Sequence, residues 1–236
     1  AVQRLARATR SRGEGGVVAV TGSAGKTSTK DVIAAVISTE IAVGKTVGNF
    51  NNHVGLPLSI LRMPDEARVA VLEIGMNHAG EIRDLAQIAR PRVAVVTNVG
   101  YAHIEGFDSI EEIAAAKREL VEALPADGVA VLNADDTRVR AFRESHPGRT
   151  ISYGLGEGSE VRATAVEYLA EGTRFRIGAT AFQTDLTGRH GILNILAGVA
   201  VAGLYGISPH RLQDAVRALQ PSKMRGERIR RNGITI

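Results

Sequence analysis

A glycine-rich segment near the start of the chain has the residue types of a phosphate-binding loop. Residues 21–27 read Thr-Gly-Ser-Ala-Gly-Lys-Thr, after a run of β-branched residues and before a helical stretch. The glycines allow backbone N–H groups to turn toward an anion, and the start of the helix adds partial positive charge. Lys26 can then neutralise the β- and γ-phosphates of a nucleotide, and the Thr27 hydroxyl can bind Mg²⁺.

This loop is shorter than the usual pattern of its kind. The usual pattern places its first glycine where this chain has Val20, and here the first glycine is Gly22. The alternative is a strand-to-helix turn whose lysine binds no phosphate. The strand before the loop and the helix after it favour a nucleotide site. Its predicted binding residues are Gly22, Ser23, Ala24, Gly25, Lys26, Thr27 and Ser28.

Two residues with metal-binding side chains follow later strands. Glu73 comes directly after the apolar run 69–72, and His103 lies just beyond the run 93–96. The carboxyl ends of parallel strands form the edge of the sheet where ligands bind in this architecture. Glu73 would supply a carboxylate to a metal, and His103 would bind a metal or a phosphate. The alternatives are a capping or solvated glutamate and a structural histidine.

Lys117 lies on the apolar face of a predicted helix. The helix covers 109–124 and opens with Ser109 and Glu112, which have the spacing of a capping box. Lys117 follows Ile113 by four residues and so shares the apolar stripe with Ile110, Leu120 and Leu124. Because burial of a charged amine is costly, we expect an ion pair with phosphate or loss of the charge by modification. The alternative is a surface lysine that extends its head into water.

Strands and helices alternate over the first 150 residues. Apolar runs that read as buried strands cover 17–20, 69–72, 93–96 and 129–132, and helices are predicted up to about residue 38, around 80–90 and over 109–124. This pattern is typical of an α/β fold, a mostly parallel sheet flanked by helices. Later strands at 161–169 and 173–177 predict a small antiparallel β appendix, and helices are predicted at 192–205 and 209–219.

The composition narrows the classes of function. The chain has 236 residues, and 29 basic minus 25 acidic residues give a net charge of +4. The basic residues are scattered and only 4% of residues are aromatic, so we expect no nucleic-acid binding. No apolar run approaches the roughly 20 residues of a membrane span. The absence of cysteine suits the cytoplasm, where we expect the protein to act.

Taken together, these residues resemble the Mur ligase family, the ATP-dependent amide-bond ligases of peptidoglycan and cell wall synthesis. Six segments are similar to the family in order and spacing: TGSAGKTSTK, GNFNNHVGLPLSIL, LEIGMNHAGEI, NVGYAHIEGFDSIEEIAAAKRE, LNADD and GRHGILNILAGVAVA. The stretches Asn-Asn-His-Val-Gly-Leu-Pro and Ala-His-Ile-Glu-Gly-Phe look most like the branch that adds D-alanyl-D-alanine to a UDP-muramoyl tripeptide.

The resemblance implies a catalytic role for several residues. Lys26 and the loop amides would hold the phosphates of ATP. Thr27 and Glu73 would bind one Mg²⁺, and His103 would bind a second metal. Lys117 would carry a carbamate whose oxygens bind that second metal. The expected catalytic residues are therefore Lys26, His103 and Lys117.

The resemblance also implies residues that contact the base and the substrate. His190 and Asn194 match residues near the adenine, but Gly191 stands where the family usually has Asn. Asn49, Asn51 and Asn52 match a substrate-facing cluster, with stapling of their own loop as the alternative. The implied reaction activates a substrate carboxylate as an acyl phosphate, which the amine of D-alanyl-D-alanine then attacks with loss of phosphate.

The resemblance finally implies a division of the chain. We expect 1–16 to be a helix and linker from a missing N-terminal domain, and 17–220 to be the central ATP-binding domain. Residues 221–236 would be a linker and the first strand of a missing C-terminal domain. Such a piece would bind nucleotide weakly and would not ligate alone. The alternatives are another ligase of the superfamily, such as the folate polyglutamate ligase, or a non-catalytic P-loop module.

Overall fold

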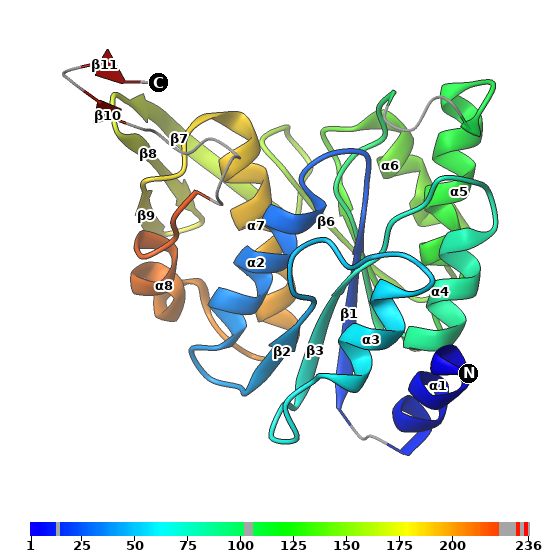
Figure 1. Cartoon of the computed structure of the whole chain (residues 1–236). Helices are drawn as coiled ribbons and strands as arrows, with labels where there is room; N and C mark the ends of the chain where they lie inside the picture. The colour runs from blue at the N-terminus through cyan, green and yellow to red at the C-terminus, as the bar shows by residue number, and fades with distance from the viewer. Residues whose placement is uncertain (13–14, 102–105, 222–229, 232–233, 236) are drawn as a thin grey trace.

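A twisted main sheet runs through the middle of the molecule, with helices on both faces (Figure 1). The computed structural model describes residues 1–12, 15–101, 106–221, 230–231 and 234–235. Nine strands pair in the order β2-β3-β1-β4-β5-β6-β7-β8-β9. They are β1 Gly16–Thr21, β2 Val43–Lys45, β3 Val69–Glu73, β4 Val93–Val96, β5 Val129–Asn133, β6 Arg149–Gly154, β7 Val161–Leu169, β8 Gly172–Ile177 and β9 Thr180–Thr184.

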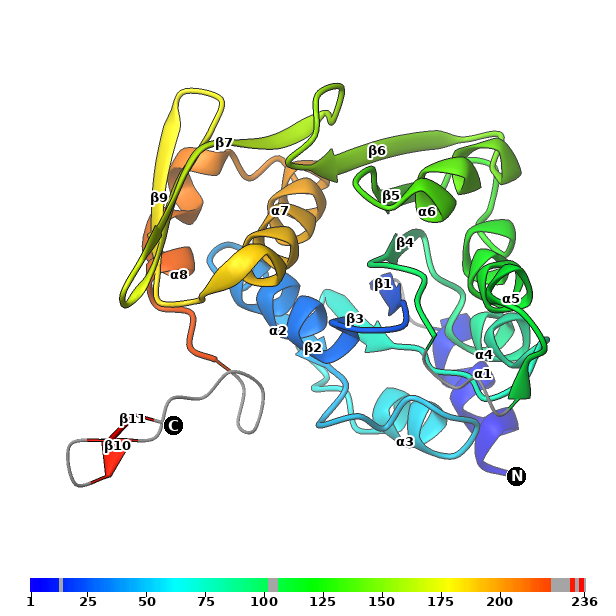
Figure 2. The ribbon, with the colours of Figure 1, turned by 90° about the horizontal axis from the view of Figure 1, so that it is seen from above.

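The helices divide between the two faces of the sheet. Helices α2 and α7 pack together on one face, and α3, α4 and α5 cover the other (Figures 1 and 2). The helices are α1 Val2–Arg12, α2 Lys26–Ile37, α3 Gly55–Leu61, α4 Glu81–Ala89, α5 Ile110–Glu122, α6 Thr137–Ala141, α7 Gly188–Leu204 and α8 Gln213–Arg217. Among the described residues, the 3₁₀ turns η2 Phe142–Ser145 and η3 Pro209–Leu212 precede β6 and α8.

Strand β1 lies where the chain changes direction across the sheet. It pairs in parallel with β3 on one side and with β4 on the other. All neighbours from β2 to β7 are parallel, so their carboxyl ends share one edge. In an open α/β sheet, ligands bind outside this edge at the point where the strand order reverses. The loops that follow β1, β3 and β4 are therefore brought together there.

The apolar runs are continuous because both faces of the sheet are buried. In β1, Val18 and Val20 belong to the core under α2 and α7, whereas Val17 and Ala19 belong to the core under the other helices. The same alternation holds in β3 and β4. Successive side chains of a strand point to opposite faces, so a strand that is covered on both sides needs apolar residues at every position. This confirms the α/β fold that the sequence predicts.

The predicted antiparallel appendix is confirmed, and it forms one end of the main sheet. Strand β7 pairs in parallel with β6 and antiparallel with β8, which pairs with β9. Seen from above, the part of the sheet from β6 to β9 curves around α7 (Figure 2). The sequence prediction missed β2, β6 and β9. Strand β2 has only three residues, and β6 begins with polar residues at an exposed end, so neither forms an apolar run.

The last helices also differ from their predicted bounds. Helix α7 begins at Gly188, four residues before the predicted start. The sequence prediction missed this first turn because its residues, Gly-Arg-His-Gly, include no large apolar side chain. The predicted helix 209–219 is a 3₁₀ turn followed by the short α8. The predicted final strand is instead a pair of two-residue antiparallel strands, β10 Arg230–Arg231 and β11 Ile234–Thr235. Within the described part of the chain, no helix has the length and apolar character needed to cross a membrane.

Candidate functional site

The loop between β1 and α2 can be built only with glycine at two positions. Gly25 is the N-cap residue of α2 and has a φ of 80°, a left-handed conformation that strains other residues. At Gly22, a Cβ atom would lie 1.9 Å from Thr97 Oγ1. Gly22 thus allows the loop to lie directly against the end of β4. The start of α2 is left open to the cleft, as a phosphate site requires.

The end of β4 fixes the shape of this loop. Thr97 Oγ1 donates to Ala24 O at 2.7 Å, and Asn98 Oδ1 accepts from Ala24 N at 2.8 Å. The Ser23 hydroxyl bonds to both backbone groups of Gly100, at 2.8 and 2.9 Å. The sequence analysis missed Thr97 and Asn98. Their position directly after a buried strand, next to β1 in the sheet, is the signal that could have identified them.

Lys26 lies over the loop that it belongs to. Its Nζ atom donates to Gly22 O at 2.8 Å and lies 3.4 Å from Ser23 O. Lys26 also lines the cleft. The ammonium group therefore stays at the open side of the loop, where a bound phosphate would meet it.

Thr27 and Glu73 meet at the edge of the sheet. Thr27 Oγ1 donates to Glu73 Oε2 at 2.7 Å. Asn51 Nδ2 donates to Glu73 Oε1 at 2.7 Å, and Glu73 N donates to Thr46 Oγ1 at 3.2 Å. Glu73 is only 1% exposed, so the alternative of a solvated glutamate is wrong. Both carboxylate oxygens are thus held in place by neighbouring side chains.

The donor set at this point fits Mg²⁺. Mg²⁺ prefers oxygen ligands, and proteins commonly hold it with one or two carboxylates together with the phosphates of a substrate and water. A hydroxyl and a carboxylate from two different elements, beside a phosphate-type loop, match that pattern. The described residues contain no group of three or more His, Cys, Asp or Glu side chains arranged to hold a metal by themselves.

Lys30 is a buried cation that the sequence analysis did not select. It lies one turn of α2 beyond Lys26 and is 1% exposed. Its Nζ donates to Thr46 O and Gly48 O, each at 2.8 Å. Two carboxylate oxygens lie close by, Asp31 Oδ1 at 3.7 Å and Glu73 Oε2 at 4.0 Å. Burial lowers the pKa of Lys30, and the two carboxylates act in the opposite direction.

Lys117 is buried in α5, as the helical stripe predicts. It is 1% exposed, so it does not extend its head into water. Burial, with a smaller contribution from the charge of Lys26, lowers the pKa of Lys117 from 10.5 to about 7. Among the described residues, the structure records no hydrogen bond or ion pair for its amine. A large fraction of this amine is therefore neutral at neutral pH.

The start of α5 is fixed by the predicted cap. Ser109 Oγ accepts from Glu112 N at 3.2 Å. The Glu112 carboxylate accepts from Asp108 N at 3.0 Å, one residue before the amide that a reciprocal capping box would use. This cap sets where the helix begins. His103 falls outside the described residues, so its predicted metal contact is not described.

A cleft of about 970 Å³ opens beside the loop. Lys26, Thr27 and Glu73 line one part of it, and His190 and Asn194 line another. Lys117 is not among the lining residues, although it lies close enough for Lys26 to affect its pKa. The cleft therefore brings together the loop, the Thr27–Glu73 pair and the start of α7. Its size suits a ligand larger than a phosphate ion.

The start of α7 forms the side of the cleft predicted to meet a base. Asn194 Oδ1 accepts from Thr29 Oγ1 at 2.9 Å, which links α7 to α2. Gly191 is buried, and a Cβ there would lie 3.0 Å from the Leu186 Cβ. An asparagine at position 191 would therefore require Leu186 to shift by a few tenths of an ångström.

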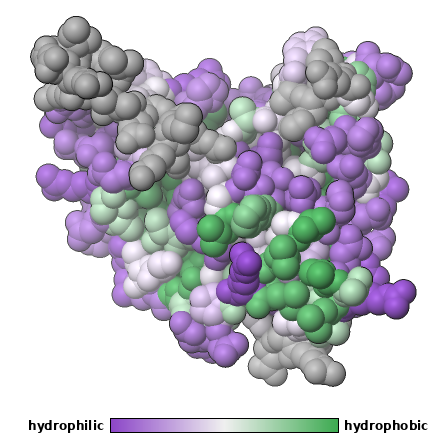
Figure 3. All heavy atoms as spheres, viewed as in Figure 1, coloured by the Kyte–Doolittle hydropathy of each residue, from purple (hydrophilic) through white to green (hydrophobic). Residues whose placement is uncertain are grey.

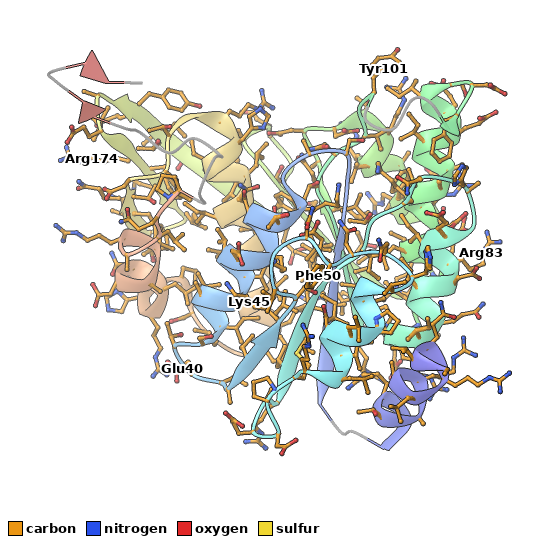
Figure 4. The ribbon with its side chains drawn as sticks, in the orientation of Figure 1. Glu40, Lys45, Phe50, Arg83, Tyr101 and Arg174 are labelled. Atoms are coloured by element: carbon orange, nitrogen blue, oxygen red, sulfur yellow. The ribbon has the colours of Figure 1, made fainter. Side chains whose placement is uncertain are left out.

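The three asparagines after β2 have different environments. Asn51 holds Glu73, and both Asn49 and Asn51 line the cleft. Asn52 Oδ1 accepts from Val54 N and Gly55 N, so it staples the loop at the start of α3. This loop also exposes the apolar side chains of Val47, Phe50 and Val54. Figure 3 shows apolar surface in the lower middle of this face, and Figure 4 labels Phe50 of this loop.

Comparison with known proteins identifies the chain. The family model described as the Mur ligase middle domain matches residues 20–202. The chain belongs to the Mur ligase family. It is 39% identical over 231 residues to the UDP-N-acetylmuramoyl-tripeptide–D-alanyl-D-alanine ligase of Bacillus subtilis, and the match covers 97% of this chain and 49% of the relative.

Solved structures of Mur ligases agree with this assignment. A crystal structure of MurF from Acinetobacter baumannii matches with a TM-score of 0.93 and 31% identity, over 99% of this chain and 52% of that one. MurF from Thermotoga maritima, in complex with ADP, matches with a TM-score of 0.88 and 31% identity, over 99% and 55%. The chain thus spans about half the length of the Mur ligases that it resembles.

Proposed function

We propose that this chain binds ATP with Mg²⁺ in the cleft beside the 22–27 loop. The observation that supports this most directly is the Thr27–Glu73 contact at the open end of that loop. In this site, Lys26 and the loop amides bind the β- and γ-phosphates. Thr27 and Glu73 provide the oxygen ligands of the metal. The Thermotoga maritima MurF, which has the same fold, was crystallised in complex with ADP, and this supports the choice of nucleotide.

We also propose that the whole enzyme to which this domain corresponds is a ligase that adds D-alanyl-D-alanine to a UDP-muramoyl tripeptide. The relatives named above add D-alanyl-D-alanine to a UDP-muramoyl tripeptide. The tripeptide carboxylate attacks the γ-phosphorus of ATP, which forms an acyl phosphate and releases ADP. The amine of D-alanyl-D-alanine then attacks the acyl carbon. Phosphate leaves with the bonding electrons, the nitrogen loses a proton, and an amide remains.

The residues of this chain act by position and charge in that reaction. The metal, when bound, neutralises negative charge on the phosphates. Lys26 holds the transferred phosphoryl group against the loop, and the buried Glu73 keeps its oxygens in a fixed direction. Positioning and charge neutralisation supply most of the catalysis in phosphoryl transfer. No side-chain nucleophile is needed.

The environment of Lys117 suits a lysine that carries a carbamate. A carbamate forms when a neutral amine adds to CO₂ and loses a proton. Because the pKa of Lys117 is about 7, its amine is substantially neutral under physiological conditions. The carbamate is an anion, and the positive charge of Lys26 acts at this position and would stabilise it. We propose that this carbamate and His103 bind a second metal, as the family resemblance implies.

The remaining proposals concern the wider protein. We infer that 1–16 lead in from an N-terminal domain, that 17–220 form the ATP-binding unit, and that 221–236 lead into a C-terminal domain. Those domains and the UDP-muramoyl peptide would be the partners of this unit. His190 and Asn194 would contact the adenine, and Asn49, Asn51 and Asn52 would face the peptide substrate. The enzyme would act in the cytoplasm, where its nucleotide substrates are made.

Two experiments test this function. Calorimetric titration of the chain with ADP should show binding that strengthens when Mg²⁺ is added. Phosphate release that depends on D-alanyl-D-alanine should be far slower with this chain than with an intact ligase. Turnover equal to the intact ligase would contradict the division into domains. A panel of UDP-muramoyl peptides, offered to the intact enzyme, would distinguish this activity from that of a sister ligase.

A further inference from the structure

Lys30 is a buried charge for which phosphate binding offers no role. It lies on the face of α2 that packs toward β2 and β3, behind the residues that meet the phosphates. A fully buried ammonium is costly unless it is paired and hydrogen-bonded. Two of its three N–H groups are used by Thr46 O and Gly48 O. The carboxylate oxygens of Asp31 and Glu73 lie 3.7 and 4.0 Å from Nζ.

The two carboxylates near Lys30 differ in their other partners. Asp31 is half-buried and also pairs with Lys45, whose amine lies 2.6 Å from Asp31 Oδ1. Glu73 is buried, and its oxygens receive hydrogen bonds from a hydroxyl and an amide, which carry no charge. Lys30, at 4.0 Å from Glu73 Oε2, is the buried cation that offsets this carboxylate. The pair is close to neutral overall.

A neutral pair attracts a free divalent cation far less than a lone carboxylate does. Two like charges a few ångströms apart in a protein interior repel strongly, because the medium screens them poorly. A metal that arrives with phosphate is different, since the phosphate brings negative charge and interacts with Lys26. The arrangement therefore favours the metal–nucleotide complex over the bare ion.

We propose that Lys30 is the resident counter-ion of Glu73, and that it makes the metal site selective for a cation that arrives with phosphate. This inference rests on the proposed Mg²⁺–nucleotide site. In the free protein, Lys30 occupies the electrostatic role that a metal would otherwise take. It acts through Glu73, so it is a positioning and selectivity residue and does not touch substrate.

Removal of the charge should create an affinity for the bare metal. Lys30→Met keeps most of the length of the side chain and loses the charge. At about pH 8, Mn²⁺ without nucleotide should bind this variant at least about tenfold more tightly than the wild type. About 10 mM MgCl₂ should raise its melting temperature by about 3 °C or more, with little effect on the wild type. If the substitution acted only by disturbing the packing around Lys30, metal binding would become weaker instead.

Four controls identify the cause. Lys30→Arg keeps the charge and should behave like the wild type. Arg149→Met removes an exposed charge at the opposite end of the sheet and should also leave metal binding unchanged. The double variant Lys30→Met/Glu73→Gln should lose the gain, because the carboxylate that attracts the metal is gone. NaCl of equal ionic strength should not reproduce the effect of MgCl₂.

The outcomes separate this inference from the proposed function. If Lys30→Met and a second variant, Lys30→Gln, bind Mn²⁺ no better than the wild type, the counter-ion role is wrong. The same conclusion follows if neither variant folds in the presence of MgCl₂, because the cation should replace the lost charge. If the variants gain metal affinity but the wild type binds no Mg²⁺–ADP, the counter-ion role stands and the nucleotide site is wrong.

Discussion

The Thr27 hydroxyl lies 2.7 Å from Glu73 Oε2, although 46 residues separate the two in the chain. Thr27 belongs to the first turn of α2 and Glu73 to the last position of β3, and each comes directly from the edge of the sheet beside β1. The contact therefore exists only when β1 and β3 pair in register. It joins the loop that would hold phosphates to the carboxylate that would hold their metal.

Thr27→Val tests the metal role of this hydroxyl. Valine has nearly the same shape but no oxygen, so Glu73 loses one of its hydrogen-bond donors and the metal loses a ligand. We expect the increase in ADP affinity caused by Mg²⁺ to fall by about tenfold or more, while affinity in EDTA changes little. Thr27→Ser keeps the hydroxyl and should retain the metal effect. Equal loss with and without Mg²⁺ would contradict the assignment.

Lys26→Ala should remove most of the nucleotide affinity. The ammonium group is the charged partner of the phosphates, and the loop amides that remain are neutral. Calorimetry with ADP and Mg²⁺ should show a loss of about 100-fold or more. Arg149→Met removes a charge far from the loop and should bind as the wild type does. Nucleotide binding that survives in Lys26→Ala would place the phosphates elsewhere.

Lys117→Met should stabilise the chain in a pH-dependent way. The pKa of Lys117 is about 7 in the folded chain, whereas an exposed lysine has a pKa near its ordinary value of 10.5. Below about pH 7 both states carry the proton, and the folded state bears the full cost of the buried charge. Between about pH 7 and 10 the unfolded state holds more protons, so wild-type stability rises with pH.

The advantage of Lys117→Met is therefore largest in acid and shrinks toward alkaline pH. Between about pH 6 and pH 9 it should decrease by on the order of 2–3 kcal/mol in the free energy of unfolding. Urea titrations in CO₂-free buffer measure this difference. If the stability advantage of Lys117→Met is the same at both pH values, Lys117 does not carry a buried positive charge.

In the intact enzyme, Lys117→Ala should spare nucleotide binding but lose turnover, with recovery when a small carboxylate is added.

Gly22→Ala should destabilise the fold. The added Cβ would lie 1.9 Å from Thr97 Oγ1, and the position has a φ of 151°. We expect a loss of about 2–6 kcal/mol in the free energy of unfolding. Gly203→Ala is the matched control, since a Cβ there meets no atom within 4 Å in α7, and it should be neutral or slightly stabilising.

A second substitution tests the cause of that loss. Thr97→Ala removes the oxygen that the new Cβ would meet, so part of the stability should return in Gly22→Ala/Thr97→Ala. If the double variant recovers nothing, the loss comes from backbone strain rather than from the contact with Thr97.

The sequence was sufficient for the parts of the molecule that have strong local signals. The four apolar runs are β1, β3, β4 and β5 because strands covered on both faces need apolar residues throughout. The loop, Glu73 and the buried Lys117 follow from residue type and spacing on those elements. Strands β2, β6 and β9 were missed because short or half-exposed strands have no such run.

The residues that the sequence could not identify depend on contacts between distant segments. Thr97 and Asn98 have no motif of their own, and their role comes from the pairing of β4 with β1. Lys30 lies in a helix next to a polar face, where a lysine ordinarily reaches water. Only the packing of α2 against the segment after β2 shows that this lysine is enclosed.

A crystal structure of this chain with a non-hydrolysable ATP analogue and Mg²⁺ tests the central claim most directly. The account predicts the phosphates on the 22–27 loop within hydrogen-bond distance of Lys26 Nζ, and a metal bound by Thr27 Oγ1 and Glu73. Phosphates bound away from that loop, or a metal that does not contact Thr27 and Glu73, would contradict it.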